Sequence, residues 1–188
     1  MGYEGIEMKL DIIEAARSGD RQAFDVLAAG IVDHLYSVAR LILRDADRAE
    51  DATQEALVRC WRDLPSLRDP SRFDAWLSRL LVHAVNDEFR RGRRQRALIA
   101  ILPLEPAVGD SSTALVVRDQ LDRGFRRLSP EHRTVIVLRL YLGLSIEEAA
   151  DSIGIPVGTA KSRLHYATEA MRLALEADAR PTSGEVSA

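Results

Sequence analysis

The sequence predicts an all-α protein built from two small helical domains joined by a flexible linker. Two observations support this fold class. Apolar residues recur at steps of three and four through most of the chain, which is the period of amphipathic helices. The pattern breaks between residues 97 and 113, where residues typical of loops gather. They are Pro103, Pro106, Gly109, Asp110, Ser111 and Ser112. The first part of this segment, residues 97–102, is apolar, and it either continues the preceding helix or packs on a domain or partner.

The N-terminal half is predicted to hold four helices, enough for a bundle domain. The expected ranges are about 7–17, 21–42, 47–64 and 71–94. Asp20 is a suitable N-cap for the second helix, because its carboxylate can accept hydrogen bonds from the first free amides. The third and fourth helices are separated by the loop sequence PSLRDP. The fourth carries the broadest apolar stripe, which starts at Phe73 and ends at Phe89.

The C-terminal half is predicted to begin with a helix over about 114–127. The pair Ser129-Pro130 is a strong start for the next helix, with serine as the cap and proline in the first turn. Gly143 ends that helix. The last residues, 177–188, include the sequence RPTSGEVSA and are expected to be disordered.

The segment Leu144–Ala167 is predicted to form two short helices joined by a tight turn. Ser145 is expected to cap the first helix, with Glu148 completing a capping box. Gly154 suits the left-handed conformation that ends this helix, and Pro156 fits the first turn of the next. This layout is typical of a helix-turn-helix whose second helix contacts DNA. The alternative is an ordinary helical hairpin with a solvated basic face.

The second helix of this motif carries different chemistry on its different faces. Its apolar residues recur at steps of three and four and are expected to face the domain core. They are Val157, Ala160, Leu164, Ala167 and Met171. The other faces carry polar residues suited to phosphates and base edges. These are Thr159, Lys161, Ser162, Arg163 and His165.

Charge is spread unevenly along a chain whose net charge is −3. Residues 1–64 carry 13 acidic and 8 basic residues, whereas residues 65–96 carry 4 acidic and 8 basic residues. A protein that binds DNA alone usually presents a strong cationic surface, since phosphate neutralisation supplies most non-specific affinity. We therefore expect this chain to bind DNA tightly only beside a larger partner.

Composition excludes several classes of protein. A charged fraction of 29% and the lack of an apolar run near ~20 residues predict a cytoplasmic protein without membrane insertion. The acidic N-terminus is unlike a signal peptide. The single cysteine, Cys60, is expected to be a buried structural thiol. Four dispersed histidines predict no metal site, and no phosphate loop or nucleophile–base pair predicts a cofactor or a catalytic centre.

Residues 143–167, GLSIEEAADSIGIPVGTAKSRLHYA, resemble the promoter-recognising helix-turn-helix of the extracytoplasmic-function (ECF) sigma factors. These proteins are group IV of the sigma-70 family, small bacterial transcription initiation factors. Ala160 departs from the family, which more often has a larger aliphatic residue there. The resemblance implies that the polar face of the second helix binds the minus-thirty-five promoter element. The residues concerned are Thr159, Lys161, Ser162, Arg163 and His165.

Residues 51–57, DATQEAL, together with Trp61, are similar to the sigma-two signature. In that family an acidic helix face docks on the clamp coiled coil of the RNA polymerase β′ subunit. On charge alone a merely solvated face would be favoured. Ala52 and Thr53 stand where the family usually has bulkier aliphatic residues. The resemblance implies docking through Asp47, Glu50, Asp51, Gln54, Glu55 and Arg59.

The fourth helix and the loop before it resemble the segment that recognises and melts the minus-ten promoter element. Holding an unpaired base requires a pocket and contacts to the base edge. His83 stands where the family often has asparagine, and an ordinary half-buried surface histidine is the alternative. The residues implied are Arg72, Arg79, His83, Asn86, Arg90 and Arg91.

The resemblance covers nearly the whole chain and assigns a domain to each part. These are a sigma-two domain at 1–96, a linker at 97–113, a sigma-four domain at 114–176 and a tail at 177–188. The protein would not be an enzyme. Its expected partners are core RNA polymerase, through the β′ clamp and β flap, promoter DNA and an anti-sigma factor.

Three other functions compete with this interpretation. A helix-turn-helix repressor or activator would explain residues 144–167 but not the second helical domain or its acidic face. A nucleic-acid enzyme would need clustered carboxylates or His and Cys ligands, which the sequence lacks. An interaction protein, such as a sigma-like decoy, would be distinguished by a transcription assay.

Overall fold

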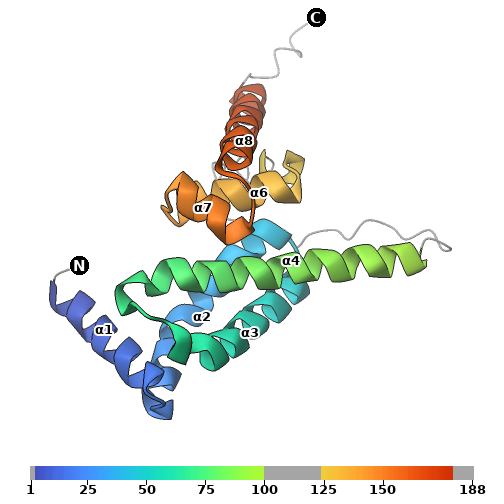
Figure 1. Ribbon diagram of the computed structural model, residues 1–188. Helices are drawn as coiled ribbons and strands as arrows, with labels where there is room; N and C mark the ends of the chain where they lie inside the picture. Colours follow the sequence, from blue (N-terminus) through green and yellow to red (C-terminus); the bar gives the residue numbers. More distant parts are fainter. Residues whose placement is uncertain (1–2, 100–123, 180–188) are drawn as a thin grey trace, which may run out of the picture.

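The computed structural model describes residues 3–99 and 124–179, and its helices pack as two domains (Figure 1). No strand occurs within these residues, so the predicted all-α class is confirmed. Most of the predicted linker at 97–113 and all but the end of the predicted helix at 114–127 lie outside the described residues. So does the tail beyond residue 179.

The N-terminal domain contains the four predicted helices. They are α1 (Tyr3–Arg17), α2 (Arg21–Leu43), α3 (Ala46–Asp63) and α4 (Phe73–Ile99). Asp20 caps α2, and its Oδ1 accepts hydrogen bonds from the backbone amides of Gln22 and Ala23 at 2.8 and 3.1 Å. The expected loop before α4 instead contains two short 3₁₀ turns. They are η1 (Leu64–Ser66) and η2 (Pro70–Arg72), each with a proline at its start.

The core of this domain is built around α2. By length and composition alone α2 is apolar enough to cross a membrane. Its apolar stripe instead faces α1, α3 and α4, and buries Leu27, Ile31, Leu35, Val38, Ala39, Ile42 and Leu43. Each fully buried leucine or isoleucine contributes about 1.5–3 kcal/mol to stability. The helix therefore behaves as the core helix of a bundle.

Small residues bring α3 close to its neighbours. Ala49, Ala52, Ala56 and Cys60 are fully buried along one face of α3, which packs on both α2 and α4. Thr53 is also buried, and its hydroxyl donates a hydrogen bond to the backbone oxygen of Ala49 at 2.7 Å. The small residues at positions 52 and 53 thus suit a tight helix contact.

Helix α4 is longer than predicted. Its end was expected near residue 94, with a continuation through the apolar residues 97–102 left open, and the helix runs to Ile99. The apolar residues after position 96 therefore extend the helix before the chain leaves the described part. At the other end, the ammonium of Lys9 on α1 pairs with Asp74 at 2.8 Å, joining the first helix to the start of α4.

The C-terminal domain contains α6, a wide turn η3, α7 and α8. Their bounds are α6 Pro130–Ile136, η3 Val137–Tyr141, α7 Ile146–Ile153 and α8 Val157–Ala179. Ser129 caps α6 as predicted, accepting a hydrogen bond from the His132 amide. The sequence predicted one regular helix up to Leu142, whereas η3 is π-helical, with the Leu142 amide bonded to the Val137 oxygen at 3.0 Å.

The two domains pack against each other. In Figure 1, α7 lies against α4 while α8 points away from the four-helix domain. Helix α6 and η3 contact α2. Val82 of α4 is 0% exposed, because it packs with Leu138, Leu144 and Ala149 of the C-terminal domain. We call this contact between α4 and α7, with the residues packed around Val82, the α4–α7 seam.

Candidate nucleic-acid interface

The helix-turn-helix is fixed by local hydrogen bonds at the start of α7. The amide of Glu148 donates to the Ser145 hydroxyl at 3.1 Å, and the amide of Ser145 donates to the Glu148 carboxylate at 2.8 Å. Hydrogen bonds from Ser145 hold the pKa of Glu148 below its ordinary value, and the bond from the Ser145 amide has the largest effect. Gly154 ends α7 at φ +74°. The predicted capping box and left-handed turn are both confirmed.

Helix α8 has the two faces that the sequence predicted. Ala160, Ala167 and Met171 are buried, and Val157 and Leu164 are half-buried against the core. The predicted DNA-binding residues Thr159, Lys161, Ser162 and His165 are exposed, whereas Arg163 is half-buried. Within the described part of the chain neither Lys161 nor Arg163 takes part in an ion pair. Their charges are therefore not neutralised by these residues.

Sequence reasoning missed an aromatic residue beside this polar face. Tyr166 is 63% exposed, and its ring lies 5.7 Å from that of His165 and 6.4 Å from that of His132. Residues 165 and 166 fall between the apolar positions 164 and 167. This position outside the apolar stripe predicts that Tyr166 is exposed, because an aromatic residue off the buried stripe of a helix lies on its surface.

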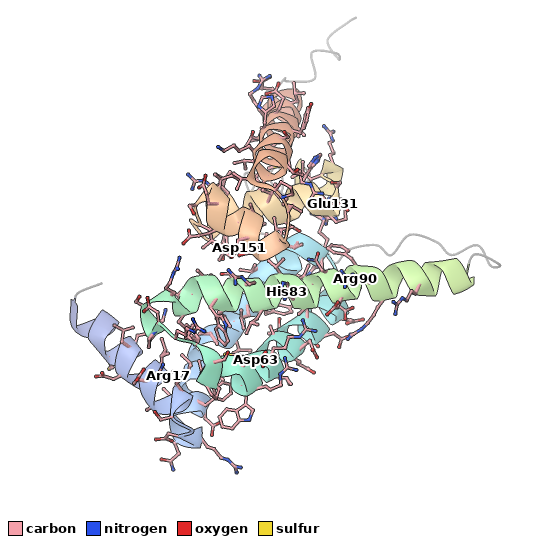
Figure 2. The ribbon with its side chains drawn as sticks, in the orientation of Figure 1. Arg17, Asp63, His83, Arg90, Glu131 and Asp151 are labelled. Atoms are coloured by element: carbon pink, nitrogen blue, oxygen red, sulfur yellow. The ribbon has the colours of Figure 1, made fainter. Side chains whose placement is uncertain are left out.

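A second polar surface lies on α4, where the sequence predicted minus-ten contacts. A cleft of about 350 Å³ is lined by Arg59, His83, Asn86, Asp87, Arg90 and Ile153. Figure 2 shows His83 and Arg90 along α4, with Asp151 of α7 above that helix. The structure thus brings together three predicted residues, His83, Asn86 and Arg90. Ile153 enters the same cleft from the other domain.

Ion pairs organise the floor of this cleft. Arg59 of α3 binds Glu55 at 2.8 Å and Asp87 of α4 at 2.7 Å. The hydrogen bond from Arg59 is the main reason that the pKa of Asp87 lies below its ordinary value. Arg90 lies 3.4 Å from Asp87, and Arg91 pairs with the buried carboxylate of Glu88. The cationic end of α4 is therefore partly neutralised by its own helix.

Two other predicted minus-ten residues act on the C-terminal domain, Arg79 by direct contact and the exposed Arg72 of η2 through its charge alone. Arg79 forms an ion pair with Asp151 of α7. The cation of Arg72 contributes to the lowered pKa of Glu148, after the larger effect of the Ser145 hydrogen bonds. The six residues predicted on one DNA-binding surface are thus divided between the cleft, the seam, the exposed end of α4 and the turn η2.

The predicted polymerase-docking face on α3 is exposed in part, and two of its residues are held in ion pairs. Asp47, Glu50, Asp51 and Gln54 are exposed, as expected of a surface that meets a partner. Glu55 is only half-exposed and Arg59 has a side-chain exposure of 18%, since the two are paired with each other and with Asp87. The expectation of one fully exposed charged face is therefore wrong for these two residues. Their charges hold α3 to α4.

Two large apolar side chains lie exposed on the same helix, and only Trp61 belongs to the sequence signature described above. Val58 is 60% exposed and Trp61 is 40% exposed. The Trp61 ring meets Phe24 of α2 edge-on at 4.7 Å between centroids. Exposed large apolar residues beside an acidic face are typical of a protein contact surface. The signal for Val58 was its place midway between Ala56 and Cys60, two positions from either residue of the buried stripe.

The described residues contain no group of three or more His, Cys, Asp or Glu side chains able to hold a metal ion. Cys60 is a buried free thiol, as predicted. Burial is the main cause that raises its pKa to about 12.

Two family models match the chain. Sigma-70 region 2 matches residues 30–95, and Sigma-70, region 4 matches residues 118–171. The RNA polymerase sigma-H factor of Pseudomonas aeruginosa is 32% identical over 186 residues, covering 90% of this chain and 95% of that relative. The ECF RNA polymerase sigma factor SigL of Mycobacterium tuberculosis is 37% identical over 148 residues, covering 76% and 82%.

Solved structures agree with these relatives. The sigma factor RpoE in complex with the anti-sigma factor NepR, from Bartonella quintana, matches with a TM-score of 0.69 and 25% identity over 82% of this chain and 98% of that one. CnrH in complex with the cytosolic domain of CnrY matches with a TM-score of 0.61 and 28% identity over 91% and 99%. With both sigma-70 regions in order on this fold, the chain belongs to the ECF sigma factors of the sigma-70 family, transcription initiation factors, not enzymes, that direct RNA polymerase to promoters.

Proposed function

We propose that this sigma factor divides promoter recognition between its two domains. The sigma-four domain, residues 114–176, recognises the minus-thirty-five element through α8. The sigma-two domain, residues 1–96, docks on core polymerase and melts the minus-ten element. The linker at 97–113 joins them. The observation that supports this most directly is α8, the second helix of a capped helix-turn-helix, which turns a polar face to solvent.

Contacts to the minus-thirty-five element are assigned to one face of α8. Thr159, Lys161, Ser162, Arg163 and His165 are the residues concerned. Arginine can bind a guanine edge through two parallel hydrogen bonds, whereas lysine acts on phosphates as a point charge. We therefore assign base recognition to Arg163 and phosphate contact to Lys161.

Contacts to the minus-ten element are assigned to the cleft on α4 and the cations around it. His83 and Asn86 offer hydrogen-bond donors and acceptors to the edge of an unpaired base. Arg72, Arg79, Arg90 and Arg91 supply positive charge for the single strand. Arg90 and Arg91 lie at the cleft and beyond it, where a strand leaving the cleft would pass.

Docking on core polymerase is assigned to α3. The exposed carboxylates of Asp47, Glu50 and Asp51, with Gln54, form an acidic face suited to the β′ clamp. Glu55 and Arg59 support this face through their ion pairs. We assign contact with the β flap of core polymerase to the sigma-four domain.

Regulation and location are proposed by analogy with the relatives. The two similar solved structures are sigma factors held by an anti-sigma factor or by the cytosolic domain of CnrY. We assign this chain an anti-sigma partner as well, and we place its action in the cytoplasm.

The test is run-off transcription with bacterial core polymerase on the promoter upstream of the protein's own gene. Arg163→Ala is expected to lose about 1–3 kcal/mol of promoter binding and to relax sequence preference at one base pair. Lys161→Ala is expected to weaken binding to all sequences alike and to reduce the salt dependence. Both should cut transcription from promoters that depend on the minus-thirty-five element.

Arg172→Ala is the matched control, because Arg172 is an exposed arginine further along α8 that is paired with Glu169 and Glu176. It should leave promoter binding unchanged, and all three variants should bind core polymerase normally. Normal transcription by both Arg163→Ala and Lys161→Ala would show that these cations only form a solvated surface of the helix and do not contact the promoter.

A further inference from the structure

Helix α1 lies outside the part of the chain that the region 2 family model matches. That match begins at residue 30, whereas α1 ends at Arg17. The region 2 match therefore assigns this helix no role. One side of α1 belongs to the core of the N-terminal domain, since Ile13 is 1% exposed and Ala16 is 3% exposed. Two charged residues on the same side make contacts beyond that core.

These two residues face the segment that leads into α4. Lys9, Ile13 and Arg17 are spaced by four positions, so they share one face of α1. Helix α1 contacts η1 and η2 as well as α2, and it lies at the end of the domain where α4 begins (Figure 1). We call residues 64–73, which run from η1 through η2 to the first residue of α4, the pre-α4 loop.

Arg17 binds the middle of the pre-α4 loop. Its Nη1 donates a hydrogen bond to the backbone oxygen of Leu67 at 2.9 Å. Its Nη2 donates to the carboxylate of Glu14 at 2.6 Å, which fixes the direction of the guanidinium. In Figure 2, Arg17 lies where α1 meets this loop. A hydrogen bond from a charged donor is stronger than a neutral one, so this contact fixes the loop backbone between η1 and η2.

Lys9 binds the far end of the same segment. Its Nζ lies 2.8 and 2.9 Å from the two carboxylate oxygens of Asp74, in the first turn of α4. The pair is exposed, with side-chain exposures of 44% for Lys9 and 73% for Asp74. Such a pair adds little to the free energy of unfolding. It does set the distance between α1 and the start of α4.

The loop has its own local bonds between these two contacts. The Asp69 Oδ1 accepts hydrogen bonds from the Ser71 amide at 3.0 Å and the Ser71 hydroxyl at 2.6 Å. These bonds fix the shape of η2, but they join only neighbouring residues. Arg72, an assigned minus-ten contact, is exposed at the end of η2. Its place on the domain therefore depends on contacts that reach the loop from elsewhere, and α1 supplies two of them.

We propose that α1 holds the pre-α4 loop in the geometry that takes an unpaired minus-ten base, and that Arg17 and Lys9 are positioning residues for this step. Neither residue contacts the DNA. Both act through the loop and the first turn of α4. A loop that is already ordered does not lose conformational entropy when the strand binds, so the strand binds more tightly. The inference rests on the proposed minus-ten role of α4 and the loop before it.

The first test measures strand binding by the complex of the full-length protein with core polymerase. The probe is a fluorescent non-template minus-ten strand of the promoter upstream of the protein's own gene. Arg17→Met keeps the aliphatic stem but removes both hydrogen bonds, and it should weaken binding about fivefold. Arg21→Met is the matched control, because it removes the same charge from an exposed position at the start of α2.

Two further readouts separate positioning from a general loss of structure. Arg17→Lys should recover most of the strand affinity, since an ammonium can also donate to the Leu67 oxygen. Binding of the same complexes to a duplex that carries only the minus-thirty-five element should not change. Circular dichroism and thermal unfolding confirm that each variant is folded. If Arg17→Met does not fold, the charge-reversal variants of the second test decide alone.

The second test reverses the ion pair and predicts a sign that charge alone would not give. Asp74→Lys repels Lys9 and also adds positive charge close to the strand. Simple attraction would then strengthen strand binding, whereas loss of the contact with α1 should weaken it about threefold. Adding Lys9→Asp reverses the pair and restores the wild-type net charge. The double variant should bind the strand like the wild type.

The proposal is overturned if Arg17→Met binds the strand like Arg21→Met. It is also overturned if Asp74→Lys binds the strand as tightly as the wild type or more tightly. Preference of the wild-type complex for the minus-ten strand over a scrambled strand tests the proposed function separately. A wild type that shows this preference, with variants that bind like their controls, rejects the role of α1 and keeps the function. A wild type without the preference rejects the minus-ten assignment itself.

Discussion

At the scale of single residues, Cys60 shows how burial changes the acidity of a thiol. The thiol lies on the face of α3 that packs into the bundle and is 0% exposed. Burial raises its pKa to about 12, because a thiolate would lose its hydration there. The unfolded chain has no such environment. Its thiol therefore loses its proton at a lower pH than the thiol of the folded protein.

This difference predicts a dependence of stability on alkaline pH. The contribution of the thiol is complete below the unfolded pKa and is lost as the pH rises towards the folded value. Between those limits the free energy of unfolding should fall by about 1.4 kcal/mol per pH unit. Urea unfolding of the wild type and of Cys60→Ala, measured from neutral to alkaline pH, tests this. Parallel curves for the two proteins would contradict it.

At the scale of elements, α3 carries two sets of charged residues, one exposed to solvent and one paired with α4. Its exposed carboxylates face solvent, whereas Arg59 crosses to α4 and binds Asp87 at 2.7 Å. Arg48 supports the same junction, since its guanidinium donates to the backbone oxygen of Glu88 at 2.7 Å and lies over the Phe89 ring. These contacts fix the position of α4 relative to the docking helix.

Arg59→Met should therefore destabilise the N-terminal domain by about 1 kcal/mol at neutral pH, because it leaves Asp87 without its main partner. The pKa of Asp87 is lowered in the folded state, so this stabilisation is present above the unfolded pKa and is lost as the pH falls through the folded value. The difference from wild type in urea unfolding should thus shrink in acid.

Arg62→Met is the control for this experiment. Arg62 is on the same helix but is exposed and pairs only with the adjacent Asp63 among the residues that the structure describes. Its loss should change stability by less than about 0.5 kcal/mol. Equal destabilisation by both substitutions would argue against a specific link between α3 and α4.

The exposed face of α3 gives a prediction about polymerase binding. Glu50→Lys with Asp51→Lys should weaken binding to core polymerase severalfold or more, because two carboxylates facing a basic partner become repulsive. Both residues are exposed, so helicity should not change. Asp25→Lys, an exposed reversal on α2, is the control. Reversal of Glu55 is less informative, since it would also break the ion pair with Arg59. Unchanged affinity in the double variant would exclude this docking face.

The elements that the sequence predicted best are those fixed by local chemistry. The capping box of Ser145 and Glu148 spans three residues, and Gly154 ends its helix by its own conformational freedom. The π-helical turn η3 had no such local signal. The pair of Arg59 and Asp87 joins residues 28 positions apart, so spacing within one helix could not predict it.

At the scale of the whole molecule, pairing between distant residues decides which charges are available. The sequence predicted a basic island over residues 65–96, but Arg79 is paired with Asp151, 72 positions away in the chain. Arg90 and Arg91 are paired with acids on their own helix. The cationic surface left for DNA is therefore smaller than the count of basic residues indicates. Composition carries no information about such pairing.

The free protein is accordingly expected to bind duplex promoter DNA weakly. A net charge of −3 and paired arginines leave few cations to displace counterions from phosphates. Anisotropy titrations of a labelled promoter duplex should show weak, nearly non-specific binding by the free chain at physiological salt. The complex with core polymerase should bind the same duplex tightly and reject a scrambled minus-thirty-five element. Tight, sequence-specific binding by the free protein would instead support a repressor or activator that acts without polymerase, because such a protein must hold its operator alone.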